Sequence, residues 1–81
     1  MKLYHISQSV NNDYDTFSDA IVCAASEEEA RNIHPGWGTD PWREDTYGTW
    51  CKSPDQVKVE YIGEAASHLV KGVICSSFHA G

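Results

Sequence analysis

Three stretches of the sequence carry the alternation of polar and apolar residues, or the composition, that is typical of β-strands. In residues 2–8 the side chains alternate between two faces, with Leu3, His5 and Ser7 on one and Tyr4, Ile6 and Gln8 on the other. Residues 56–62 alternate in the same way, with Val57, Val59 and Tyr61 on one face and Lys58, Glu60 and Ile62 on the other. Gly63 is predicted to end that strand, and residues 72–78 are predicted to form the last one.

A further strand is predicted at residues 20–25, which read Ala-Ile-Val-Cys-Ala-Ala without alternation. A continuous apolar run between turn signals indicates a strand that is covered on both faces. The turn signal before it is the polar stretch at residues 11–16.

A short helix is predicted to begin at Ser26. Ser26 can accept a hydrogen bond from the amide three residues on, and Glu29 can reach back, which is the capping-box pattern. The acidic residues of this first turn also suit the positive end of the helix dipole. Ala30 and Ile33 should face inward, and Pro35 should end the helix near Asn32 or Ile33.

The order of these elements predicts a single α+β domain over residues 1–81. We expect a small, mostly antiparallel four-stranded sheet with one short helix, in the order β-β-α-loop-β-β. Ile, Leu, Val and Phe together number only 15 of the 81 residues, so the core is thin and depends on aromatic side chains. Because such short domains are marginal alone, we expect a homo-oligomer, either a dimer or a tetramer.

The charge of the chain limits its partners. With 12 acidic and 6 basic residues the formal charge is −6, which argues against a DNA or RNA polymer because phosphate neutralisation needs clustered cations. A small nucleotide or a basic protein surface is compatible with this charge. The sequence has no apolar run long enough to span a bilayer and no apolar signal core at its N-terminus. We therefore expect no membrane partner and a cytoplasmic location.

The cysteines do not indicate a disulfide framework. Cys23, Cys51 and Cys75 are odd in number and lack CxxC spacing. Cys23 and Cys75 lie in apolar runs, which predicts that they are small buried side chains. Cys51, beside Lys52, is the one whose setting could favour a thiolate.

No metal, other cofactor or catalytic activity is predicted. Cys51 with His34 is a poor start for a zinc site, because structural zinc takes four ligands at short paired spacings. Asp13, Asp15 and Asp19 lack the spacing of a calcium loop. A core this thin can hardly build the preorganised pocket that an enzyme without a cofactor would need.

The unusual part of the chain is residues 34–55, a 22-residue connection that holds all three Trp and all three Pro. Connections of this length are often functional. One interpretation is that its aromatic side chains fold back into the core. The other is a recognition surface, in which the rings stack on nucleobases and the cations neutralise phosphate. The predicted ligand-binding residues are Trp37, Trp42, Arg43, Tyr47, Trp50 and Lys52.

Several short motifs resemble known proteins. Tyr4-x-Ile6, Tyr14-Asp15 and residues 24–30 (Ala-Ala-Ser-Glu-x-Glu-Ala) resemble the small type II-C anti-CRISPR proteins that block the HNH nuclease domain of their Cas target. In that family a Ser-Cys pair near the C-terminus faces the nuclease active site, and the matching positions here are Ser77 and Phe78. The resemblance implies protein-contact residues in the acidic turn and at the end of the last strand, namely Asp13, Tyr14, Asp15, Ser77, Phe78 and His79.

More broadly, the sequence resembles a group of small tailed-phage proteins. The shared motifs are Tyr14-Asp15-Thr16, Ser26-x-x-x-Ala30-Arg31, residues 59–65 (Val-x-Tyr-Ile-Gly-x-Ala) and Lys71-Gly72-Val73-Ile74. This resemblance implies interference with host defence by stoichiometric binding. Phage proteins with such roles include oligomeric sponges that sequester cyclic-nucleotide alarm signals, which an aromatic segment with one Arg would suit.

The sequence therefore supports three hypotheses. The first is a non-enzymatic, phage-type inhibitor of bacterial defence that acts as a sponge for a cyclic or other small nucleotide signal. The second is an anti-CRISPR protein that binds and blocks the HNH domain of a Cas nuclease. The third is an accessory module without a ligand, whose Trp residues all belong to the core.

Overall fold

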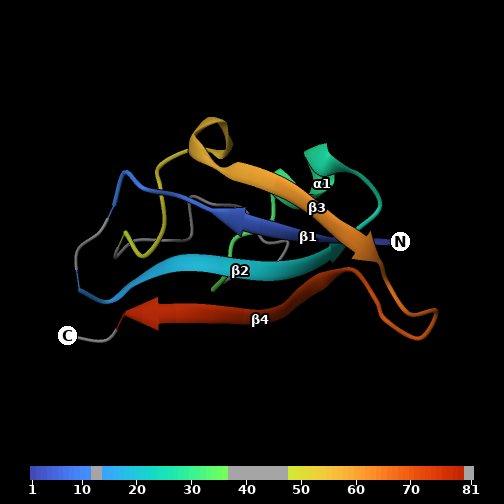
Figure 1. The fold of residues 1–81 in the computed structure, drawn as a ribbon. Helices are drawn as coiled ribbons and strands as arrows, with labels where there is room; N and C mark the ends of the chain where they lie inside the picture. Colours follow the sequence, from blue (N-terminus) through green and yellow to red (C-terminus); the bar gives the residue numbers. More distant parts are fainter. Residues whose placement is uncertain (12–13, 37–47, 80–81) are drawn as a thin grey trace.

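The protein folds as a four-stranded antiparallel sheet with one short helix (Figure 1). The computed structural model describes residues 1–11, 14–36 and 48–79. Its elements are β1 (Lys2–Ser7), β2 (Thr16–Ala24), α1 (Glu27–Arg31), the 3-10 helix η2 (Pro54–Gln56), β3 (Lys58–Glu64) and β4 (Gly72–His79). The predicted α+β fold is confirmed.

The two N-terminal strands form the centre of the sheet, whose strand order is β3-β1-β2-β4. β1 pairs with β2 so that Tyr4 lies opposite Val22, and every neighbouring pair is antiparallel. β3 and β4 are consecutive in sequence but lie at opposite edges, so the connection between them crosses the whole sheet at one end (Figure 1).

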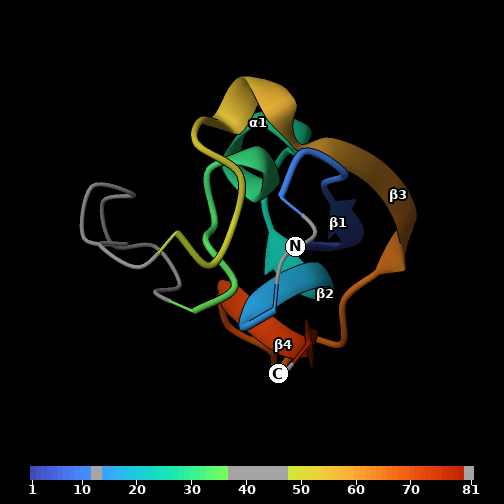
Figure 2. The same ribbon diagram turned by 90° about the vertical axis from the view of Figure 1, so that its left-hand side faces the viewer.

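One face of the sheet carries the core. Figure 2 shows α1 and η2 together on one side of the curved sheet. The buried cluster there combines strand residues with Trp50 and Cys51 from the segment before η2, and comprises Tyr4, Ile6, Ala20, Val22, Ala24, Ala30, Ile33, Trp50, Cys51 and Val57. The predicted inward positions Ala30 and Ile33 are confirmed, since both are buried.

The helix begins as its sequence predicts. Ser26 is the N-cap, and its hydroxyl accepts a hydrogen bond from the Glu29 amide at 3.2 Å. The Glu29 carboxylate in turn accepts one from the Ala25 amide at 2.9 Å, one residue earlier than in a standard capping box. Arg31 anchors the short helix, because its guanidinium donates to the backbone carbonyl of Val57 just before β3.

The turn between β1 and β2 is organised by a buried glutamine. Gln8 Nε2 donates to the carbonyls of Asn11 (2.7 Å) and Phe17 (3.0 Å). Its Oε1 accepts from the amides of Val10 (3.0 Å) and Asn11 (2.8 Å). These four bonds satisfy the buried amide and end β1 at Ser7, one residue before the predicted end.

Two predictions about β2 and β4 are corrected. The run at residues 20–25 is covered on both faces only in part, because on the side away from α1 Cys23 is buried whereas Ile21 is half-buried. Cys75 is exposed rather than buried, because it lies opposite Ile21 on that same side. An apolar run alone does not distinguish a strand with two covered faces from one that leaves its second face open.

The predicted boundaries of β2 and β3 also shift. β2 begins at Thr16, four positions earlier than predicted, because its polar first half pairs with β4. Gly63 does not end β3 but lies within it, opposite Leu3, beside a register shift and with φ of +158°. Glycine is the residue that adopts this backbone conformation readily.

Candidate functional site

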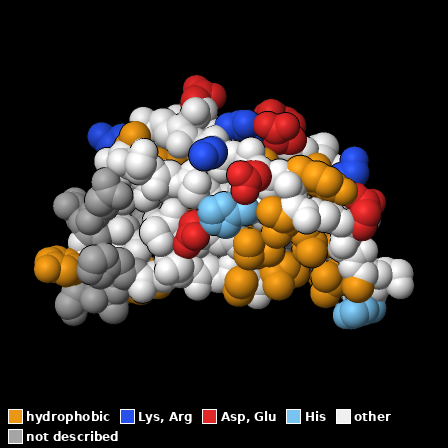
Figure 3. Space-filling model, in the orientation of Figure 1, with side chains coloured by type: hydrophobic (Ala, Val, Ile, Leu, Met, Phe, Trp, Pro, Cys, Tyr) orange, Lys and Arg blue, Asp and Glu red, His pale blue; other side chains and the backbone are white. Residues whose placement is uncertain are grey.

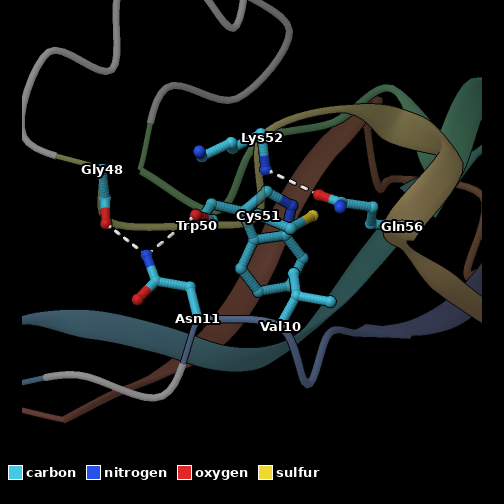
Figure 4. Close-up of a pocket in the computed structure, with 7 residues that line it drawn as sticks. All are labelled: Val10, Asn11, Gly48, Trp50, Cys51, Lys52 and Gln56. Carbon is cyan, nitrogen blue, oxygen red and sulfur yellow. Dashed lines mark hydrogen bonds between the residues drawn. The ribbon is translucent and has the colours of Figure 1, made fainter.

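A cleft lies between the β1–β2 turn and the chain that runs from Gly48 toward η2 (Figure 4). Its volume is about 480 Å³, within the range of small-molecule sites. The lining residues come from three places in the sequence and are Val10, Asn11, Gly48, Trp50, Cys51, Lys52 and Gln56. Two of the six predicted ligand-binding residues, Trp50 and Lys52, therefore line one cleft.

Asn11 joins the two sides of the cleft. Its Nδ2 donates hydrogen bonds to the backbone carbonyls of Gly48 (2.6 Å) and Trp50 (3.1 Å), as Figure 4 shows. On the opposite side, Gln56 Oε1 accepts from the Lys52 amide at 2.9 Å. The shape of the cleft is thus fixed by side-chain-to-backbone bonds.

Lys52 supplies the positive charge at the cleft. Its side chain is exposed, and Figure 4 shows it at the rim above Trp50. Within residues 1–11, 14–36 and 48–79, no carboxylate forms an ion pair with its ammonium group. Among the described residues the Lys52 ammonium is thus an unpaired positive charge at the rim of the cleft.

Trp50 is a core residue rather than an exposed platform. Only 1% of its surface is exposed, and its ring packs edge-on against His34 at 6.3 Å between centroids. A nucleobase could stack on a face of this ring only after the core opened. Its indole Nε1 is buried and has no hydrogen-bond acceptor among the described residues.

The other four predicted ligand-binding residues, Trp37, Trp42, Arg43 and Tyr47, lie outside the described residues. These four residues belong to residues 37–47, here called the aromatic segment, and the next residue in sequence is Gly48. Gly48 lines the cleft and has φ of +64°. The aromatic segment is therefore connected directly to the wall of the cleft.

Cys51 does not offer a nucleophile. Its side chain is 4% exposed, and burial raises the pKa of its thiol to about 11. The thiol also lies 3.5 Å from the Ser53 carbonyl, to which it donates. A thiol with this pKa stays protonated at neutral pH, so the predicted setting for a thiolate is not present.

The zinc alternative gains no support from the geometry of His34. This side chain is fully buried, and its Nδ1 accepts a hydrogen bond from the Gly36 amide at 2.9 Å. Across the described parts of the chain, no three His, Cys, Asp or Glu side chains gather as a metal site would require. None of the described helices is long and apolar enough to cross a membrane.

The residues of the protein-contact hypothesis meet at one end of the sheet. Thr16 lies opposite His79 and Phe17 opposite Phe78, so the turn before β2 is next to the end of β4. Tyr14 is 70% exposed and Phe78 is 45% exposed. Asp15 and Ser77 are exposed as well, Asp13 lies outside the described residues, and His79 is described only as the last residue of β4.

The sheet face opposite α1 is a second surface, here called the open face. Its central residues are Leu3, His5, Ser7, Asp19, Ile21, Cys75 and Ser77. His5 Nε2 lies 2.9 Å from Asp19 Oδ2, and beside this pair is a shallow depression of about 240 Å³. Figure 3 shows the His and acidic side chains at the centre of this face, with apolar side chains gathered over β2 and β4.

Sequence reasoning missed most of the residues that build these surfaces. Asn11, Gln56 and Val10 become neighbours through long-range contacts, and a polar Asn-Asn pair signals no more than a turn. The pairing of His5 with Asp19 depends on the register of β1 against β2. The alternation of residues 2–8 does place His5 away from the core, which is the one available signal.

Comparisons with protein-family models, with curated proteins and with solved structures each find no match.

Proposed function

We propose that this protein binds a small nucleotide signal stoichiometrically, without converting it, and so withdraws the signal from a bacterial defence response. The observation that carries the proposal is that Lys52 and the return of the aromatic segment at Gly48 share one cleft. A cyclic nucleotide presents phosphate for the ammonium group, and bases for the stacking that the sequence predicts at Trp37, Trp42 and Tyr47, which lie outside the described residues.

The cleft has the size and polarity that such a ligand needs. Its volume of about 480 Å³ suits a ligand of nucleotide size. The Asn11 and Gln56 side chains offer amide groups beside the cation, and Val10 adds an apolar wall. Because the protonated Cys51 thiol is a poor nucleophile, binding without turnover fits this lining better than covalent catalysis.

The charge of the protein makes the cation important. A chain of net charge −6 repels a nucleotide at long range, so binding should depend on local cations and should weaken as salt is raised. A hydrogen bond to a charged group contributes about 1.5–3 kcal/mol, and we expect Lys52→Ala to weaken binding by roughly 10- to 100-fold.

Native mass spectrometry and titration calorimetry with cyclic di-AMP, cyclic di-GMP and cyclic GMP-AMP test the proposal. The expected result is tight binding of at least one of them and recovery of the intact nucleotide after heat denaturation. Lys71→Ala is the matched control, because Lys71 pairs with Glu29 across 3.6 Å near the far end of β2. No binding of any nucleotide at 100-fold excess, or recovery of a hydrolysed product, would exclude the sponge function.

The second candidate is an anti-CRISPR protein that covers the basic surface of an HNH nuclease domain. The pairing of Phe17 with Phe78 favours it, because this pairing brings the acidic turn beside the end of β4. Asp15→Asn should weaken co-purification with an HNH domain, since Asn keeps the left-handed backbone of Asp15 (φ of 60°) and removes its charge. Asp55→Asn, in η2, is the control, and undiminished DNA cleavage at excess inhibitor would exclude this candidate.

The third candidate is an accessory module without a ligand. It predicts neither nucleotide binding nor co-purification with an HNH domain. Its signature would be Trp fluorescence that is typical of buried rings and unchanged by every nucleotide in the panel.

A further inference from the structure

The edge of the sheet at β4 differs from the edge at β3. β4 holds eight residues, Gly-Val-Ile-Cys-Ser-Ser-Phe-His, without Asp, Glu, Lys, Arg or Pro. β3 carries Lys58, Glu60 and Glu64. Natural sheets protect an edge strand with charged residues or proline, because its unpaired backbone groups would otherwise pair with another chain. By this criterion β3 is a protected edge and β4 is not.

The outer edge of β4 has no strand beside it among the described residues. Its register with β2 shifts beside Ile74 and again between Ser77 and Phe78, and residues 75–77 between these two shifts pair regularly with residues 19–21. At about 3.4 Å per residue, the full eight-residue strand extends roughly 27 Å. The backbone of β4 therefore presents a long and partly regular row of hydrogen-bonding groups.

Exposed apolar side chains lie along the same strand. Ile74 and Phe78 are each 45% exposed, and Cys75 is exposed on the open face next to the half-buried Ile21. Figure 3 shows this apolar area continuing from β2 onto β4. Pairing at the β4 edge would bring part of this area into an interface.

The charge of the chain indicates which partner suits this edge. Two molecules of net charge −6 repel each other wherever their acidic groups meet. β4 contains no Asp, Glu, Lys or Arg, and His79 is its one basic residue. Two copies can therefore join there with little like-charge contact. A basic partner protein would instead be attracted to acidic residues such as those near Asp15.

We propose that β4 pairs antiparallel with β4 of a second copy about a two-fold axis, which joins the two sheets into one. The same surface on both copies closes the assembly as a dimer. This inference does not depend on the nucleotide ligand. A chain this small has a thin core and gains stability from further burial. A continuous eight-stranded sheet shared by two copies would supply that burial.

Light scattering and native mass spectrometry of the full chain test the proposal. We expect twice the 9.0 kDa chain mass. Ile74→Lys should convert the protein to a monomer, because a lysine on the edge opposes pairing. Ile62→Lys is the matched control, since Ile62 is 47% exposed on the opposite edge strand and should leave the dimer intact.

Ser76→Lys provides a second test within the regular part of β4. Circular dichroism would confirm that each variant is folded, and hydrogen exchange should show β4 amides that lose protection in the monomeric variants. A wild-type monomer at 100 µM would overturn the proposal. So would an assembly that Ile74→Lys and Ser76→Lys both leave intact, or one that Ile62→Lys disrupts equally.

Discussion

Asn11 donates a 3.1 Å hydrogen bond to the backbone carbonyl of Trp50, across 39 positions of sequence. The same amide nitrogen donates to the Gly48 carbonyl at 2.6 Å. These two bonds attach the β1–β2 turn to the chain that returns from the aromatic segment. Since Asn11 and Trp50 both line the cleft, the stability of the fold and the shape of the candidate site depend on the same contact.

Replacing Asn11 should therefore destabilise the protein. Asn11→Ala removes both bonds and leaves the partly buried Trp50 carbonyl and the exposed Gly48 carbonyl without this donor, which should cost about 1–3 kcal/mol. Urea unfolding measures the loss. Asn32→Ala is the control, since the Asn32 amide bonds within its own helix to the Glu28 carbonyl and is exposed. Equal losses for the two variants would contradict the linking role of Asn11.

Trp50 should matter for folding more than any exposed aromatic residue. Trp50→Ala should cost about 3–5 kcal/mol because it leaves a large cavity. Trp50→Phe should cost less, since it keeps an aromatic ring and removes an indole N–H that has no acceptor in the described part of the chain. Denaturant unfolding compares these variants with Tyr14→Ala, at a 70% exposed position, where a change within about 0.5 kcal/mol is expected.

Ser26 should stabilise the short helix through its cap. Ser26→Ala removes the bond from the Glu29 amide and should cost about 0.5–2 kcal/mol in thermal or urea unfolding. Ser26→Asp should restore most of the stability, because an aspartate accepts the same bond and also suits the helix dipole. If Ser26→Asp were as unstable as Ser26→Ala, the cap would not be the source of the loss.

The three cysteines should react in a fixed order with iodoacetamide. Cys75 is exposed, whereas Cys23 and Cys51 are buried. At pH 8 the folded protein should gain one adduct, at Cys75, and the other two should react only after unfolding. Mass spectrometry with peptide mapping identifies the site. Early modification of Cys51 would contradict its burial in the cleft wall.

The raised pKa of Cys51 also predicts how stability changes at alkaline pH. Burial raises the pKa of this thiol from 9.0 to about 11, so the unfolded chain loses the proton first as pH rises. The unfolded state then binds fewer protons than the folded state, and stability falls between about pH 9 and pH 11. Urea unfolding across this range should show a shallower decline for Cys51→Ala than for the wild type.

Much of the fold could be predicted because its signals are local. The alternation around Tyr4 and Ile6 predicts a strand whose side chains divide between two faces, and Ser26 with Glu29 predicts the helix start. Both follow from side-chain periodicity and capping chemistry, which need no knowledge of the distant chain. The start of β2 at Thr16 was not predictable, because the polar residues there are held by pairing with β4.

The candidate site was less predictable for a related reason. Lys52 and Trp50 were identified from their residue types, but Asn11 was not, because its role depends on a contact with carbonyls far along the chain. Burial also could not be predicted for single side chains. Trp50 and Cys75 were each predictable as apolar, yet one lies in the core and the other on the open face.

The strand order β3-β1-β2-β4 has a consequence for how the chain folds. The central hairpin involves residues close in sequence, whereas Lys2 pairs with Glu64 and Thr16 with His79. Both edge strands thus form only after loops of roughly fifty to sixty residues have closed, and such long-range pairing slows folding. A nascent chain can form the β1–β2 hairpin and α1 early, but its sheet is complete only after β4 has been synthesised.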